Sequence, residues 1–160
     1  MNKTVAAAAL AVAMGTAPVM AVDLIPIVDT TGGHVWDGFY AGVLGGVWNG
    51  NSLYLLGGAS LGANFTITDN LVLGVEGRGV IYSDSDVGFD GTVRLGAAMD
   101  DILVYGNAGL GMRDGNSHFF VGGGVEAVVM DNVTIDGRAE FVTGSGFNAI
   151  RGTVALNLHL

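Results

Sequence analysis

The sequence contains no cysteine and only two prolines in 160 residues. Without cysteine the chain forms neither a disulfide scaffold nor a thiolate zinc site. Collagen is excluded because it requires far more proline and a strict glycine triplet. Intrinsic disorder is excluded because disordered chains are poor in apolar residues, whereas 50% of this sequence is hydrophobic and its mean hydropathy is +0.52.

Basic residues and long apolar runs are also scarce. Six Lys and Arg stand against fifteen Asp and Glu, a net charge of −9, which is the wrong sign for a nucleic-acid partner. Charged residues make up 13% of the chain, against about 25% in soluble domains, so much of the surface is expected to be apolar. No segment after the N-terminal region approaches the ~20 apolar residues of a membrane-spanning helix. Glycine, with 28 residues, is abundant instead.

The N-terminus has the features of a secretory signal peptide. Lys3 precedes an apolar run of ten residues, and small residues before the bond after Ala21 suit signal peptidase. The apolar run is too short to be a membrane anchor. We therefore expect residues 1–21 to be a signal peptide for export, residues 22–35 a periplasmic N-terminal stub, and residues 36–160 one folded domain.

The folded domain carries an internal repeat at its turns. Asp69, Asp100 and Asp131 lie in similar tripeptides and are spaced 31 residues apart. A step of 32 residues back from Asp69 reaches Asp37, and residues 37–160 have the length of four units of 31. A second cluster of turn-forming residues falls midway in each unit. Each unit is therefore predicted to be one hairpin, which gives eight strands.

Within the predicted strands, apolar residues and glycine alternate with polar residues. Charged residues of one strand share the same parity, as Glu76 does with Arg78 and Asp90 with Arg94. A barrel of eight strands is too narrow to hold the apolar set inside, whereas a membrane barrel places such a set against lipid. The predicted fold is all-β: an eight-stranded antiparallel transmembrane β-barrel of four hairpins, with strands of about 10–13 residues that suit a tilted crossing. Outer-membrane lipid and lipopolysaccharide are the partners it implies.

The lumen face is predicted to hold a layered network of ion pairs, which we take as the candidate site. Antiparallel register places Glu76 opposite Arg94 with Arg78 diagonal to Asp90, Glu140 close to Arg151, and Glu126 against Asp136 with Arg138 able to bridge them. Counted from the turns, one group lies at mid-depth and the other nearer the outer mouth. The mid-depth group comprises Glu76, Arg94, Glu126, Asp136 and Arg138, and the second comprises Arg78, Asp90, Glu140 and Arg151.

Two functions follow from this lumen. One is a structural or envelope-integrity barrel whose lumen is filled by side chains, and the other is a narrow diffusion pore for small solutes. Bulky residues such as Trp48, Tyr54, Tyr105 and Phe120 favour the first, whereas lumen glycines such as Gly46 leave room for the second. A lipid-modifying enzyme would need polar residues on the lipid face, where none is found. We therefore expect no enzymatic activity and no cofactor.

The lipid face contains glycines on two neighbouring strands. Gly77 and Gly79 on one strand lie near Gly91 on the next, and small residues allow close approach between membrane elements. This groove is predicted to contact a lipid, a lipoprotein or a second barrel, so homo- or hetero-oligomerisation through it is one expectation. A smooth wall without a partner is the alternative.

Several segments resemble a known family. Residues 36–46 read WDGFYAGVLGG, and residues 70–78, 124–141 and 152–160 follow the same family order. They resemble the small alphaproteobacterial outer-membrane immunogenic, porin-like proteins. The resemblance implies an OmpA-like eight-stranded barrel in the Gram-negative outer membrane with structural, antigenic or weak pore roles, and no enzymatic residues. The chain departs from the family in its short surface loops and in ending with Leu160 where the family usually has Phe.

Three other patterns suggest chemistry that their context does not support. Residues 122–127 match a dinucleotide fingerprint, but a β-branched segment follows where a helix is needed. Ser117 and His118 are neighbours in a strand and point to opposite faces. Residues 84–90 contain three aspartates that could ligate Ca²⁺, but the EF-hand spacing is absent, so we interpret them as ordinary loop acids.

Overall fold

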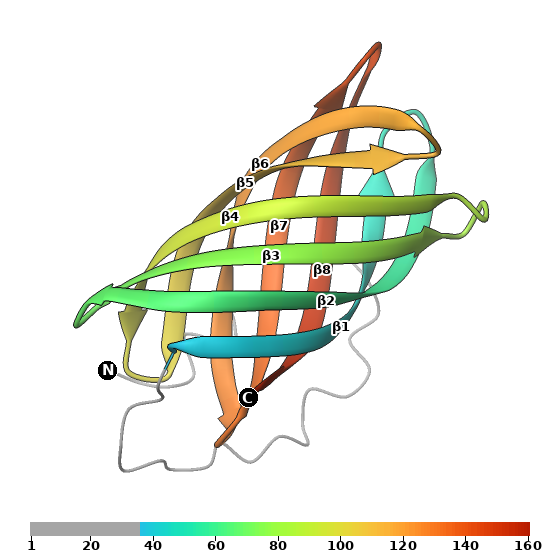
Figure 1. Ribbon diagram of the computed structural model, residues 1–160. Helices are drawn as coiled ribbons and strands as arrows, with labels where there is room; N and C mark the ends of the chain where they lie inside the picture. The colour runs from blue at the N-terminus through green and yellow to red at the C-terminus, as the bar shows by residue number, and fades with distance from the viewer. Residues whose placement is uncertain (1–35) are drawn as a thin grey trace.

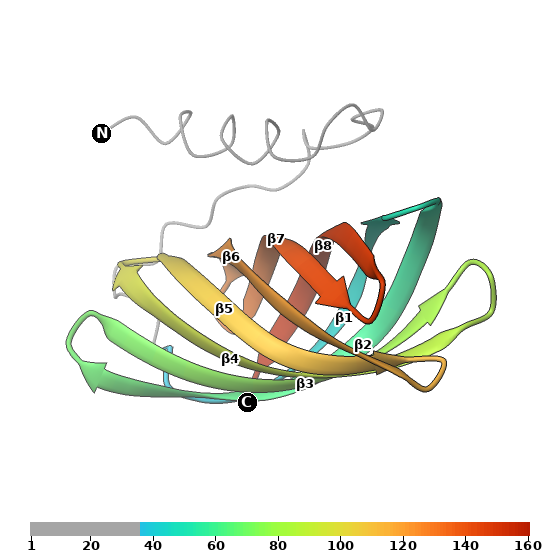
Figure 2. The same cartoon turned by 90° about the horizontal axis from the view of Figure 1, so that it is seen from above.

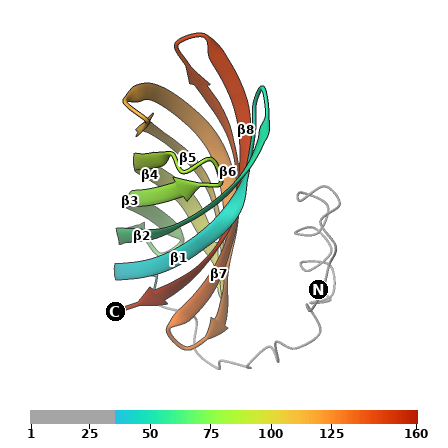
Figure 3. The ribbon, with the colours of Figure 1, turned by 90° about the vertical axis from the view of Figure 1, so that its right-hand side faces the viewer.

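The computed structural model describes residues 36–160, which form eight strands and no helix (Figure 1). The predicted signal peptide and N-terminal stub lie outside these residues. The strands pair antiparallel in chain order and β1 also pairs with β8, as Figure 3 shows, which closes the barrel. The predicted fold is confirmed. The strands are β1 (Gly38–Asn49), β2 (Leu53–Thr68), β3 (Leu71–Tyr82), β4 (Val87–Met99), β5 (Ile102–Arg113), β6 (Asn116–Met130), β7 (Val133–Gly144) and β8 (Phe147–His159).

Short connections join the strands at both ends of the barrel (Figure 2). We call one end the turn end, where two-residue turns lie at 69–70, 100–101 and 131–132. The other is the loop end, where residues 50–52, 83–86, 114–115 and 145–146 lie. Asp100 has φ 52° and Asp114 has φ 46°. Aspartate tolerates this left-handed region because its short side chain bonds to the local backbone, which explains the aspartates at positions 100 and 114.

Two strands are longer than the sequence predicted. β2 has 16 residues and β6 has 15, against the expected 10–13. The pairing of β2 with β3 shifts between Thr66 and Thr68, and that of β6 with β7 shifts between Val128 and Met130. Such a shift is a β-bulge, which adds a residue to one strand and bends it. The turn signals could not reveal the bulges because the extra residues continue the strand.

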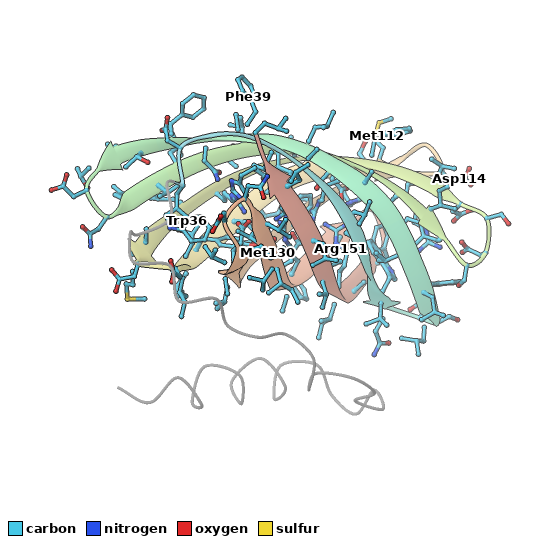
Figure 4. The ribbon with its side chains drawn as sticks, turned by 90° about the horizontal axis from the view of Figure 1, so that it is seen from below. Trp36, Phe39, Met112, Asp114, Met130 and Arg151 are labelled. Carbon is cyan, nitrogen blue, oxygen red and sulfur yellow. The ribbon has the colours of Figure 1, made fainter. Side chains whose placement is uncertain are left out.

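The two faces of the barrel differ sharply in polarity. Large apolar side chains such as Phe39, at 68% exposed, and Leu110, also at 68%, project from the outer face. Figure 4 shows Phe39 and Met112 pointing outward, whereas Arg151 lies within the barrel. Alternation along each strand puts the polar residues inside, as predicted. Among residues 36–160 no helix is long and apolar enough to cross a membrane.

The lumen glycines do not leave the room that the sequence suggested. A Cβ atom at Gly46 would lie 2.1 Å from the carbonyl oxygen of Gly152 on the neighbouring strand. A Cβ atom at Gly62 would lie 2.3 Å from the ring of Tyr40. Glycine is therefore needed at these positions because neighbouring backbone or side chains already occupy the space beside it. This corrects the view that each lumen glycine contributes to an open path.

Candidate functional site in the barrel lumen

Nine charged side chains from five strands point into the lumen. Their exposed fractions run from 0% for Glu126 to 8% for Arg138. Alternation on β3, β4, β6, β7 and β8 aims them inward. Buried charges persist only when they are paired and hydrogen-bonded, so their contacts define what the lumen can do. The nine are Glu76, Arg78, Asp90, Arg94, Glu126, Asp136, Arg138, Glu140 and Arg151.

Three of the ion pairs join strands that lie four apart in the ring of eight. Arg138 Nη1 on β7 lies 2.6 Å from Glu76 Oε1 on β3. In the opposite direction, Arg78 Nη2 on β3 lies 3.0 Å from Glu140 Oε1 on β7. Arg151 Nη1 on β8 lies 2.7 Å from Asp90 Oδ2 on β4. Strands four apart in a closed ring of eight face each other, so these side chains meet across the full width of the barrel.

The charged groups nearer the turn end form what we call the turn-side cluster, which comprises Glu76, Arg94, Glu126, Asp136 and Arg138. Arg94 Nη1 donates to Glu126 Oε2 at 2.8 Å, and Arg138 pairs with both Asp136 and Glu76. Neutral donors complete the carboxylate shells: Tyr40 donates to Glu76 at 2.8 Å and Tyr105 donates to Asp136 at 2.6 Å.

Glu126 has the largest set of side-chain partners in the turn-side cluster. Asn157 Nδ2 donates to Glu126 Oε1 at 2.9 Å, and the Thr134 hydroxyl donates to the same oxygen. His159 Nε2 lies 3.3 Å from this oxygen as well. Glu126 therefore joins β6 to β4, β7 and β8.

The remaining four charged groups form the loop-side cluster, Arg78, Asp90, Glu140 and Arg151. Each arginine contacts both carboxylates, with N···O distances of 2.6 to 3.3 Å. His118 Nε2 lies 3.1 Å from Asp90 Oδ1, and Asn107 Nδ2 donates to Glu140 at 2.6 Å. Arg78 Nε also lies 3.7 Å from Glu76 Oε1, which links the two clusters.

The predicted pairing between β3 and β4 is wrong by two residues. Arg78 lies directly opposite Asp90, and Glu76 lies opposite Thr92 rather than Arg94. The four-residue loop at 83–86 sets this register, because Tyr82 N bonds to the carbonyl oxygen of Asp86. Elsewhere Glu126 lies opposite Asp136 and Glu140 opposite Arg151, as expected.

The partner of Glu126 also differs from the prediction. Arg94 on β4 forms the ion pair with Glu126, whereas Arg138 pairs with Glu76 across the lumen. The sequence suggested instead that Arg138 would bridge Glu126 and Asp136, which are near it in the hairpin of β6 and β7. The register of a hairpin identifies which residues of its two strands are neighbours. It carries no information about which strand lies opposite the hairpin across the lumen.

Apolar clusters lie at both ends of the charged lumen. Near the turn end, Trp36 packs with Val72, Ala98, Leu103 and Tyr105, and its Nε1 donates to the carbonyl oxygen of Asp100 at 3.2 Å. The sequence did not predict this role of Trp36, because Trp36 precedes β1 and so has no strand parity to reveal it. Near the loop end the cluster comprises Trp48, Leu56, Val80, Tyr82, Phe120, Val142 and Ala149.

Arg113 stands at the loop end among aromatic rings. Its guanidinium carbon lies 4.1 Å from the ring centre of Tyr82 and 4.5 Å from that of Tyr54, within cation–π range. Its nitrogen atoms also pair with Asp84 and with Asp86, the latter at 3.0 Å. Asp84 and Asp86 are therefore both paired with Arg113. Within residues 36–160, no group of three or more metal-ligating side chains is found.

The lipid-face groove differs in extent from the one expected. A groove of about 580 Å³ lies on the outer face of β1 to β4, with Leu61, Val75, Gly77 and Gly91 among its lining residues. Gly77 lies opposite Gly91, and a Cβ atom at either would meet nothing within 4 Å. Gly79 does not line it, because it lies opposite Phe89, whose ring would contact a Cβ atom there at 3.7 Å. Binding of a lipid, a lipoprotein or a second barrel here stays a prediction.

Solved structures share this fold at low sequence identity, whereas no family model and no curated protein sequence matches the chain. Neisserial surface protein A is 13% identical, with a TM-score of 0.55 over 77% of this chain and 97% of that chain. Ail of Yersinia pestis is 12% identical, with a TM-score of 0.53 over 78% of this chain and 99% of that chain. The N-terminal β-barrel domain of Pseudomonas aeruginosa OprF is also 12% identical, with a TM-score of 0.50 over 78% and 99%. The chain therefore has the fold of eight-stranded outer-membrane barrels.

Proposed function

We propose that this chain is an integral outer-membrane β-barrel with a structural role in the cell envelope, and that side chains close its lumen to solutes. The observation that carries this proposal is the set of ion pairs across the full width of the barrel. Arg138 to Glu76 and Arg151 to Asp90 are direct contacts of 2.6 and 2.7 Å, which leave no solute path between the paired groups.

The contents of the lumen beyond the ion pairs also support closure. Phe120 and Val142, both 0% exposed, belong to the apolar cluster near the loop end, and Trp36 belongs to the one near the turn end. Bulky side chains and neighbouring backbone fill the space beside Gly46 and Gly62. The same interior supports a role without catalysis, because each of the nine buried charged side chains forms an ion pair.

Placement in the outer membrane rests on the outer face. Large apolar side chains such as Phe65, Phe89 and Ile150 are 52%, 65% and 61% exposed, and a soluble monomer rarely exposes an apolar surface of this extent. A closed barrel pairs its backbone groups internally, so it is stable in lipid. The partners proposed for this face are outer-membrane lipids and lipopolysaccharide. Membership of the alphaproteobacterial porin-like family, suggested by residues 36–46, belongs to the same proposal.

Single-channel recording tests the closed lumen. The chain without residues 1–21 is refolded into planar bilayers, and we expect it to give little or no current. The double variant Glu76→Ala with Arg138→Ala removes a pair that crosses the barrel, so it is expected to conduct more. Val75→Ala serves as the matched control, because Val75 is next to Glu76 but faces outward at 44% exposure. Large, steady currents from the unmodified barrel would favour the diffusion pore instead.

A further inference from the structure

The guanidinium group of Arg113 is surrounded by three aromatic rings and two carboxylates at the loop end. Its carbon atom lies 4.1 Å from the ring centre of Tyr82, 4.5 Å from that of Tyr54 and 5.4 Å from that of Trp48. Its nitrogen atoms pair with two carboxylates of the loop at 83–86. Aromatic cages of this kind bind ligand cations in proteins. We call this one the loop-end cage, and it comprises Trp48, Tyr54, Tyr82, Asp84 and Asp86.

The loop-end cage and the cation that it holds come from different parts of the barrel. The three rings are on β1, β2 and β3, and the two carboxylates are in the loop that follows β3. Arg113 is the last residue of β5, which pairs with β4 and β6. The guanidinium group therefore enters the cage from another strand, as a separate ligand would.

Contacts that do not involve Arg113 hold the cage in place. The rings of Trp48 and Tyr82 pack edge to face, with their centres 5.6 Å apart. In the loop, Asp86 N donates to Asp84 Oδ1 at 3.2 Å, and Tyr82 N donates to the carbonyl oxygen of Asp86 at 2.9 Å. A site that is already organised binds more tightly, because little ordering remains to be done when the ligand arrives. We therefore expect the cage to keep its shape when Arg113 leaves it.

Arg113 is held by contacts that solvent and a second cation can reach. Its side chain is 13% exposed, and those of Asp84 and Asp86 are 31% and 33% exposed. Ion pairs this exposed contribute little to stability, and salt screens them. Arg151 also lies over the ring of Trp48, at 5.8 Å, but its side chain is 1% exposed and pairs with buried carboxylates. Of these two arginines, Arg113 is therefore the one that can exchange.

We propose that the loop-end cage is a binding site for a small molecule that carries a guanidinium group, and that Arg113 occupies the site when this ligand is absent. Two features of the cage select this chemistry. The ring faces attract a planar, weakly hydrated cation, and the two carboxylates accept its N–H groups. The ligand is small because the cage holds only the end of one side chain.

Binding exchanges one guanidinium group for another. A ligand that makes the same contacts displaces the charged end of Arg113 into solvent. Because none of the nine lumen charges belongs to the loop-end cage, the ion pairs across the barrel stay in place during the exchange. The site therefore adds a binding function to the barrel without opening its lumen.

The NMR signal of the Trp48 indole tests the site, with methylguanidinium as the probe and the barrel in phospholipid nanodiscs. The chain has two tryptophans, and Trp36 packs near the turn end, so its signal serves as an internal control. In Arg113→Ala we expect a saturable shift of the Trp48 signal. The unmodified barrel should show the same shift at concentrations about tenfold higher or more, because Arg113 leaves the site free for only a fraction of the time. Arg113→Gln is a second variant without the competing charge and should bind like Arg113→Ala.

Matched controls separate this site from a general effect of salt or denaturant. Adding Asp84→Asn and Asp86→Asn to Arg113→Ala should weaken binding about tenfold or more, because charge-assisted hydrogen bonds to the ligand are lost. Tetramethylammonium, which has the charge but no N–H group, should bind more weakly than methylguanidinium. Sodium chloride at the same ionic strength should leave the Trp48 signal unchanged.

Several results would overturn the proposal. They are the lack of a saturable shift in both Arg113 variants, equal affinity in the unmodified barrel and the variants, and an unmodified barrel that never responds. Binding that survives the loss of both carboxylates, or an equal shift of the Trp36 signal, would also count against the site. These measurements do not depend on whether the lumen conducts, so they can fail while the proposed function holds.

Discussion

At the scale of single residues, buried arginines connect the walls of this barrel. Arg94, at 2% exposed, donates to Glu126 and to Asn64 and lies over the rings of Tyr40 and Tyr105. Replacing a buried ion pair with apolar groups is often neutral, whereas removing one partner leaves the other charge uncompensated. Arg94 is therefore expected to contribute more to the stability of the barrel by neutralising the charge of Glu126 than through the energy of its own contacts.

Arg94→Ala is accordingly expected to destabilise the barrel by about 3–5 kcal/mol, because Glu126 loses its ion-pair partner while buried. Arg94→Leu combined with Glu126→Leu should cost less than the two single changes together, which a double-mutant cycle in vesicles measures. Arg113→Ala is the comparison, since Asp84 and Asp86 have side chains 31% and 33% exposed and exposed pairs contribute about 0–1 kcal/mol. Similar losses for Arg94→Ala and Arg113→Ala would contradict this reasoning.

At the scale of strands, glycine sets how closely neighbours approach on the lumen side. At Gly46 on β1, a Cβ atom would lie 2.1 Å from the carbonyl oxygen of Gly152 and 2.9 Å from Thr153 Cα on β8. Both are backbone atoms, which move less readily than the end of a flexible side chain. On the outer face, Gly77 on β3 has nothing within 4 Å of the same position.

Alanine substitution separates these two kinds of glycine. Gly46→Ala is expected to destabilise by ~1–3 kcal/mol, the usual cost of forcing extra volume into a packed site. Gly77→Ala is expected to be neutral or to stabilise by ~0.4–1 kcal/mol, because alanine restricts the unfolded chain. Guanidinium unfolding of both refolded variants measures the difference. If Gly77→Ala were the more harmful change, the assignment of lumen and lipid faces would be wrong.

At the scale of the whole molecule, the apolar outer face sets the depth of the barrel in a bilayer. Val75 is in the middle of β3 at 44% exposed, and Leu53 begins β2 at 65% exposed. If the outer face were in water, Leu53, the more exposed of the two positions, would have no special preference for an apolar residue. In lipid, the free-energy cost of a charged side chain depends on its depth in the bilayer and is highest at the midplane.

Val75→Arg is therefore expected to cost ~2–4 kcal/mol and Leu53→Arg ~0–1 kcal/mol in vesicles. Unfolding by urea from phospholipid vesicles gives both values. Equal costs at the two sites would mean that the outer face does not cross a hydrocarbon layer.

The sequence by itself determined the strands and their faces. A period of two is a local property, so the parity of Glu76 and Arg78 marks the lumen face whatever β3 pairs with. The repeat at Asp69, Asp100 and Asp131 likewise predicted the hairpins. The bulges at Thr66 and Val128 and the loop at 83–86 escaped this reasoning, because they change register without breaking the alternation.

Only the tertiary structure decided which charges meet. The partners Arg138 and Glu76 are 62 residues apart in sequence, and their contact depends on the closure of β1 with β8 and on every register between them. The filling of the space beside Gly46 and the use of Trp36 at the turn end depend on the same closure. Distance across a barrel is fixed by all eight strands together, whereas the face of a residue is fixed by its own strand alone.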